Sequence, residues 1–183
     1  GTDGLPGVYQ QLQDMNIHWI REEIPWREVE QTPGQFQWYY SNGSTYRDFH
    51  FMLEEAEKHD LEVVAVLSTG PAYLPHVYPD QTVDADLLVE NWENYVQAVV
   101  DRFGDKIDYW EISPQANRSE TWGKVMFPTN LDAVSPPNPF LFARMLSTAD
   151  KIIKKHNSRD TVILGGLYSS LTNNCETTPL VFL

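Results

Sequence analysis

Residues 61–67 constrain the fold of this chain more than any other stretch. They read Leu-Glu-Val-Val-Ala-Val-Leu, a nearly continuous apolar run with the length of a strand. Such a run is typical of a strand that is buried on both faces within a parallel sheet. Parallel strands are joined by crossover connections, which are usually helices. The run therefore predicts an α/β chain.

Further strand-like and helical segments alternate along the sequence. Strict alternation of this kind predicts a parallel sheet with right-handed crossovers. The expected strands are 17–24 (stopped by Pro25), 61–67, 107–113 and 161–167. The expected helices are 8–16, a segment capped by Ser44 or Thr45 that runs to about Asp60, 87–103 with Gly104 after it, and a segment from Pro139 or Phe140 to about His156.

The long loops all follow strands, whereas short connections follow helices. The expected loops are 25–43, 68–86 and 114–138. Loops at the C-terminal ends of parallel strands carry ligand sites in both barrels and open sheets. We expect one domain over residues 1–183, with an arm at 1–7 and a tail at 168–183.

Composition limits the partners of the chain. The formal net charge of −13 repels nucleic acid, and no basic run offsets it. No apolar run reaches the roughly 20 residues of a membrane span. The single cysteine, Cys175, excludes an internal disulfide. No pair of the five histidines has metal-binding spacing and the sequence has no Gly-rich phosphate loop, so neither a metal nor another cofactor is expected. A solvated acidic face is the favoured interpretation, and a calcium site the alternative, for Asp80, Asp84, Asp86 and Glu90.

The strand at 107–113 leads into a polar loop and carries the most informative residues. Glu111 lies within the strand, and Gln115 and Asn117 follow it closely. An α/β barrel presents its catalytic groups at such a place. The stretch predicts a site at the mouth of the sheet.

Two patterns connect the chain to a known family. The first is Ile20-Arg21 with Pro25-Trp26, Val29-Glu30, Pro33-Gly34, Phe36 and Trp38, and the second is Tyr109-Trp110-Glu111-Ile112. They resemble the second strand with its loop, and the fourth strand, of clan A glycoside hydrolases of the β-xylosidase/α-L-iduronidase type. These enzymes are retaining (β/α)8 barrels. The resemblance spans about residues 8–167 and implies a partial TIM (β/α)8 barrel with about four parallel strands.

The resemblance also implies a degenerate catalytic motif. The family continues its fourth strand into Asn-Glu-Pro-Asn, and this motif falls on Pro114-Gln115-Ala116-Asn117. Gln115 thus replaces the general acid/base glutamate, and a carboxamide cannot supply a proton to a leaving group. A retaining glycosidase needs two carboxyl groups about 5–5.5 Å apart. The family's nucleophile lies on the seventh strand, which we expect this chain to lack.

Arg21 and Glu111 are the charged residues expected beneath this site. Strand side chains alternate, so Glu111 shares the face of Gln115 and points into the barrel. A carboxylate there needs a partner, and Arg21 is the candidate. A structural ion pair is the favoured interpretation, and a catalytic role for the two residues is the alternative.

Several loop residues are candidate carbohydrate ligands, because aromatic faces stack on sugar rings. Two interpretations stay open for each: contact with a sugar, or packing against the domain. The same choice holds for Gln115, which either binds a sugar hydroxyl or has no ligand. The candidates besides Gln115 are Asn117, Trp122, Trp26, Trp38, Tyr73 and His76.

Three hypotheses for the function follow. The first is a glycosidase-like domain without catalysis, which binds a carbohydrate or a protein. The second is part of an active glycosidase that a missing segment or a second chain completes, as the apolar ending at 180–183 suggests. The third is a structural or assembly subunit that associates with itself, because a partial barrel leaves edge strands open.

Overall fold

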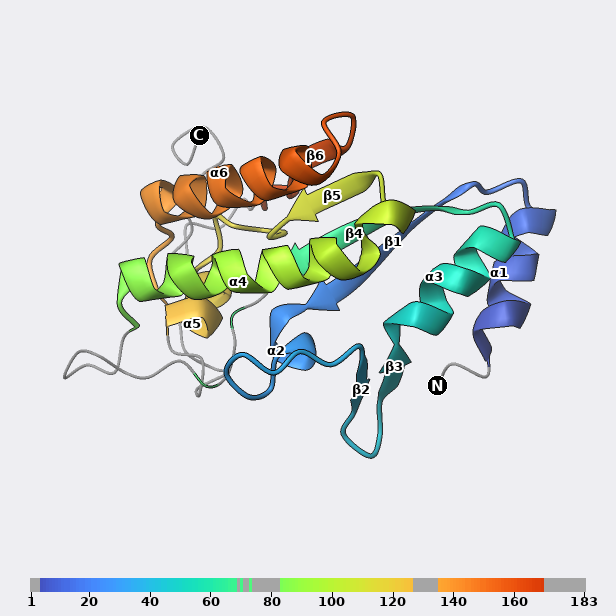
Figure 1. Cartoon of the computed structure of the whole chain (residues 1–183), viewed down its shortest axis with the longest axis horizontal. Helices are drawn as coiled ribbons and strands as arrows, with labels where there is room; N and C mark the ends of the chain where they lie inside the picture. Colours follow the sequence, from blue (N-terminus) through green and yellow to red (C-terminus); the bar gives the residue numbers. More distant parts are fainter. Residues whose placement is uncertain (1–3, 69, 71–72, 74–82, 127–134, 170–183) are drawn as a thin grey trace.

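A parallel sheet of four strands forms the centre of the molecule (Figure 1). The computed structural model describes residues 4–68, 70, 73, 83–126 and 135–169. The order of the strands is β1, β4, β5, β6, and each neighbouring pair is parallel. The predicted α/β partial barrel is confirmed. The strands are β1 (Trp19–Pro25), β4 (Glu62–Ser68), β5 (Tyr109–Ile112) and β6 (Thr161–Leu164).

Helices connect these strands and pack on one side of the sheet. In Figure 1, α4 and α6 lie side by side, and α1 lies beside α3. The indole Nε1 of Trp92 in α4 donates to the carbonyl of Met145 in α6 at 2.9 Å, which fixes these two helices together. The helices are α1 (Leu5–Asp14), α2 (Trp26–Val29), α3 (Phe49–Lys58), α4 (Ala85–Phe103), the 3₁₀ turn η2 (Gly104–Lys106), α5 (Ser119–Met126) and α6 (Pro139–His156).

The core lies between the sheet and these helices. Alternate strand residues point to this helix-packed face, and most are buried because the apolar run in each strand meets an apolar helix stripe. The other face, which we call the inner face, corresponds to the interior of a barrel. The helix-packed face holds Ile20, Glu22, Ile24, Val63, Ala65, Leu67, Trp110, Ile112, Val162 and Leu164, and the inner face holds Trp19, Arg21, Glu23, Val64, Val66, Ser68, Tyr109, Glu111, Thr161 and Ile163.

Helix α3 begins later than the sequence predicts. Residues 39–41 and 46–48 pair as an antiparallel hairpin, β2 (Tyr39–Ser41) and β3 (Tyr46–Asp48). Ser44 and Thr45 lie in its turn, where their backbone N–H groups donate to the side chain of Asn42. The predicted cap at Ser44 or Thr45 is wrong, because Asp48 caps α3 instead by accepting from Phe51 N–H at 3.1 Å.

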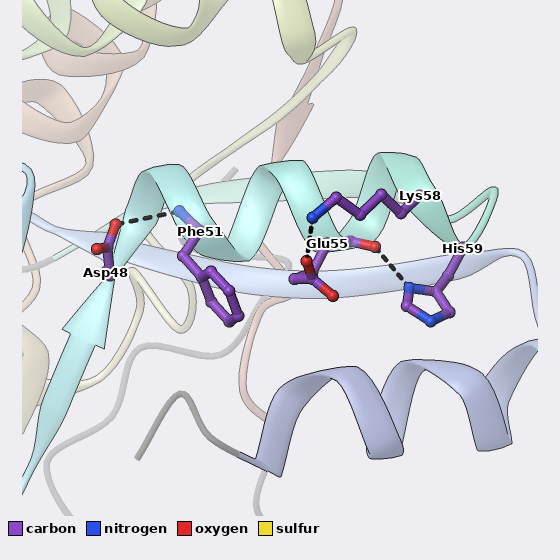
Figure 2. A network of polar contacts seen from close by, with 5 residues as sticks. All are labelled: Asp48, Phe51, Glu55, Lys58 and His59. Carbon is purple, nitrogen blue, oxygen red and sulfur yellow. Dashed lines mark hydrogen bonds and ion pairs between the residues drawn. The ribbon is translucent and has the colours of Figure 1, made fainter.

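Figure 2 shows how α3 is closed at both ends. Its first turn carries the Asp48 cap. At its last turn, Lys58 pairs with Glu55, and Nδ1 of His59 donates to the carbonyl of Glu55 at 2.8 Å. The His59 ring therefore satisfies a carbonyl that the helix itself leaves open.

Several other boundaries differ from the expectation. Helix α1 starts at Leu5, so part of the expected arm is helical, because Pro6 fits the first turn of a helix. The expected loop 25–43 contains α2 and β2, and the expected loop 114–138 contains α5. Strand β5 ends at Ile112, since Ser113 has a left-handed φ of 47°.

Gly104 does follow α4, although its backbone stays in the right-handed region. An added Cβ at Gly104 would lie 2.6 Å from Nε2 of His156, so the imidazole would have to move to make room for it. Within the described part of the chain, no helix combines the length and apolarity that crossing a membrane requires.

Candidate functional site

A cavity of about 430 Å³ opens at the C-terminal ends of β1, β4 and β5. This is the edge at which parallel α/β sheets bind ligands. The cavity contains the degenerate acid/base position, Gln115. Its described lining is mostly polar and consists of Glu23, Ser68, Ser113, Pro114, Gln115, Arg118, Glu120 and Thr121.

Arg21 and Glu111 form a two-point ion pair on the inner face. Nε of Arg21 donates to Oε2 of Glu111 at 2.6 Å, and Nη2 donates to Oε1 at 2.9 Å. Because β4 lies between β1 and β5, the arginine reaches across one strand rather than to a direct neighbour. The pair raises the pKa of Arg21, chiefly through the hydrogen bonds to Glu111.

This pair satisfies a carboxylate that is 7% exposed. Both oxygens of Glu111 accept from one guanidinium, which is the strong two-point geometry of arginine and carboxylate. The arrangement fits the favoured interpretation of a structural ion pair. A catalytic role for either residue stays a prediction.

Gln115 lies exposed at the mouth of the cavity in an uncommon backbone conformation. Its φ is 55°, and its N–H donates to the carbonyl of Gly166 at 2.8 Å. Its side-chain Oε1 accepts from Nη1 of Arg118 at 3.2 Å. The carboxamide is therefore held beside the cavity, where it can offer hydrogen bonds to a ligand but no acidic proton.

Asn117 is fully buried and fastens two loops together. Its Nδ2 donates to the carbonyl of Tyr168 at 2.7 Å, and its Oδ1 accepts from Tyr168 N–H at 2.7 Å. Both ends of the amide are thus occupied by backbone. The structure places Asn117 in a structural position rather than on the cavity wall.

The candidate aromatic residues divide between core and surface. Trp26 and Trp122 are 0% and 2% exposed, and Trp26 stacks on Tyr95 with ring centroids 5.3 Å apart. Their burial favours the interpretation in which these two rings pack against the domain, and contact with a sugar stays a prediction. Loop aromatics look alike in sequence whether they pack inward or face solvent.

Trp38 and Tyr73 are half-buried. Trp38 stacks on Phe36 and meets the edge of Phe103. Burial and the neighbouring carboxylate of Glu30 raise the pKa of Tyr73. Neither ring lines the cavity in the described part of the chain. His76 lies outside the described residues.

Two cavity residues, Glu23 and Ser68, were not among the sequence candidates. Glu23 shares the inner face with Arg21 two positions earlier, and alternation along β1 was the signal that could have found it. Ser68 ends the apolar run of β4, and its Oγ is buried without a hydrogen-bond partner among the described residues. A search of that same part of the chain finds no group of three or more His, Cys, Asp or Glu residues suited to a metal ion.

Solved structures with a similar fold were found by structural comparison. A β-glycosidase, BGL167, matches with a TM-score of 0.63 and 16% identity over 88% of this chain and 44% of its own. A family 39 glycoside hydrolase from the gut symbiont Bacteroides cellulosilyticus WH2 matches with a TM-score of 0.59 and 16% identity, over 88% and 29%. A β-glucosidase from Thermotoga maritima matches with a TM-score of 0.55 and 11% identity, over 89% and 37%.

The structural neighbours are therefore clan A glycoside hydrolases, as the sequence resemblance predicts, and the chain has the fold of part of their barrel. At these identities the likeness establishes the fold alone. The chain spans less than half the length of each of these neighbours. Searches with the sequence against protein families and against curated proteins find no match.

Proposed function

We propose that this chain is a glycoside-hydrolase-like partial barrel that binds carbohydrate at the mouth of its sheet and does not itself cleave glycosidic bonds. The observation that carries the proposal is the polar cavity of about 430 Å³ at the C-terminal ends of three parallel strands, with Gln115 on its wall. Carbohydrate enters the proposal because the structural neighbours are named as glycosidases.

The absence of cleavage follows from the chemistry of the acid/base position. Protonation of a glycosidic oxygen needs a carboxylic acid, and retention needs a second carboxylate as nucleophile. Gln115 is a carboxamide, and the Glu111 carboxylate is already bound at both oxygens by Arg21. The site is therefore suited to hydrogen bonding with sugar hydroxyls.

Two measurements on the purified chain test this proposal. Titration of ¹⁵N-labelled protein with methyl β-D-glucopyranoside should give saturable shifts around the cavity. Incubation with 4-nitrophenyl β-glycosides should release no nitrophenol above the uncatalysed rate, for the chain and for Gln115→Glu alike. Release that is proportional to protein concentration would contradict the loss of catalysis.

A second candidate function is one part of an active retaining glycosidase, completed by a further segment or a second chain. The inner face favours it, because Trp19 is 48% exposed there and packs edge-on against Tyr109 with centroids 4.6 Å apart. Strands β1 and β6 are also the outer strands of the described sheet. The coding sequence on both sides of this stretch tests the idea, which requires a further strand ending in a glutamate.

Self-association is the third hypothesis and rests on the same two outer strands. Light scattering over a range of protein concentrations separates it from the others. A mass of one chain at all concentrations would rule out assembly of the chain with itself.

A further inference from the structure

We infer that Glu23 and Ser68 form the floor of a monosaccharide subsite that holds a neutral pyranose through adjacent hydroxyl groups. The inference rests on the proposed carbohydrate binding and assigns it to two residues. Both residues line the same cavity, from neighbouring strands, and neither belongs to the ion pair beneath it.

Glu23 and Glu111 occupy the same level of the inner face but differ in their bonding. Each is paired in register with Val66 of the strand between them. Glu111 has both oxygens occupied by Arg21. Glu23 is half-buried, and among the described residues its carboxylate has neither a hydrogen bond nor an ion pair. Its acceptor oxygens are therefore available to a ligand in the cavity.

Ser68 supplies the second and independent observation. It lies two residues beyond Val66 on β4, so its side chain follows on the same face toward the mouth. The residue is 3% exposed, and its buried Oγ has no partner among the described residues. Leaving a buried hydroxyl without a hydrogen bond costs free energy. A hydroxyl group of a bound ligand would supply the missing partner.

The charges around the cavity select the kind of sugar. Glu23 repels a uronate, whose carboxylate would have to lie against it. Arg21 is already bound by both oxygens of Glu111, so it is not available to hold the carboxylate of a uronate. Arg118 is held by Gln115 and by Glu120, at 3.2 Å in each case. A neutral sugar whose adjacent hydroxyls donate to the two oxygens of Glu23 fits this balance.

The test compares three variants by the same NMR titration with methyl β-D-glucopyranoside. Glu23→Gln should weaken binding at least about tenfold, the loss of a charge-assisted hydrogen bond. Ser68→Ala should weaken binding severalfold without lowering the melting temperature, because it removes a buried hydroxyl for which the described residues supply no partner. Glu62→Gln is the matched control, an exposed glutamate at the opposite end of β4, and should bind like the wild type.

Ligand variants give a readout that does not depend on the folding of a mutant. The monodeoxy analogue that lacks a hydroxyl bound by Glu23 should bind the wild type about tenfold more weakly, and methyl β-D-glucuronide should bind more weakly still. Unchanged affinity of Glu23→Gln and Ser68→Ala beside a binding wild type would overturn the inference and leave the proposed function standing. A wild type that shows no saturable shifts would overturn both.

Discussion

Glu22 and Glu23 are neighbours in sequence and lie on opposite faces of the same sheet. Glu22 points to the helix-packed face, where burial raises its pKa. Glu23 points to the inner face and lines the cavity. The helix-packed face is otherwise apolar and closed by α3, α4 and α6. The inner face carries an ion pair, exposed Trp19 and a hydroxyl that has no hydrogen-bond partner in the described part of the chain.

The helix-packed face contributes mainly to stability, whereas the inner face carries the candidate functional groups. Burial of apolar area is the main favourable contribution to folding, and it is concentrated where the sheet meets the helices. The inner face contributes less of this burial and can hold polar groups at the C-terminal edge. Substitutions on the two faces should therefore have different consequences, and four of them test this comparison.

Trp110→Ala should have the largest effect. The side chain is fully buried on the helix-packed face, and its Nε1 donates to Oδ2 of Asp160 at 3.2 Å. Truncation should lower the free energy of unfolding by about 3–5 kcal/mol, measured by urea denaturation. The adjacent Tyr109→Ala, on the inner face and only partly buried, is the control and should cost clearly less. Equal losses would contradict the division between the faces.

Gly165→Ala tests the close approach of backbone at the mouth of the inner face. An added Cβ would lie 2.4 Å from the carbonyl oxygen of Ser113 and 2.7 Å from that of Ile112. The added methyl group should push β5 and β6 apart and lower the free energy of unfolding by about 2–3 kcal/mol, measured by chemical denaturation. At Gly166 nothing lies within 4 Å, so Gly166→Ala should be nearly neutral. An unchanged free energy of unfolding in Gly165→Ala would show that the ends of β5 and β6 can move apart without loss of stability.

Arg21→Ala tests the ion pair of the inner face. It leaves the carboxylate of Glu111 buried without its partner, while Arg21 itself has a side chain 46% exposed. The expected loss is about 1–2 kcal/mol, between the values for exposed and buried pairs. In a double-mutant cycle with Glu111→Gln, the combined loss should be smaller than the sum of the single losses. Strict additivity in thermal and urea unfolding would argue against the pair.

Glu22→Gln should have the smallest effect and the opposite sign. Burial is the main cause that raises the pKa of Glu22 above its ordinary 4.5 in the folded chain. The folded state then holds the proton more tightly than the unfolded state. Its contribution to stability is complete below pH 4.5 and is lost as the pH rises through the folded value.

Glutamine mimics the protonated form, so the variant should be slightly more stable than the wild type at pH 7. The gain should shrink toward pH 4, as measured by urea denaturation across the pH range. Glu62→Gln, an exposed substitution on β4, should show no such trend. A gain that is independent of pH would point to a cause other than the charge of Glu22.

Long periodic segments were predictable from the sequence, and short ones were not. The run 61–67 and the helix beginning at Pro139 carry their pattern over enough residues to be recognised. The three-residue strands at 39–41 and 46–48 have no such pattern, because only their pairing with each other stabilises them. The cap at Asp48 depends on where that hairpin ends, so it could not be placed before the hairpin was known.

The candidate site shows the same limit. The resemblance and the alternation of side chains led to Arg21, Glu111 and Gln115. Glu23 and Ser68 could not be found from the sequence, because what marks them is that their side chains have no partner within the described structure. Which groups surround a side chain depends on the tertiary fold. For Trp26 and Trp122 the sequence leaves sugar contact and packing as open alternatives, because a tryptophan in a loop gives no sign of whether it is buried or exposed.

The sequence by itself determined the alternation of strands and helices, the strong negative charge and the replacement of an acid by Gln115, since these are properties of residue order and type. The tertiary structure alone decided that Arg21 binds the carboxylate of Glu111 and that the carboxylate of Glu23 has no partner among the residues that the structure describes. Arg21 and Glu111 are 90 positions apart in the sequence, and the register of the strands brings them into contact across β4. Their separation in the sequence gives no indication of this contact.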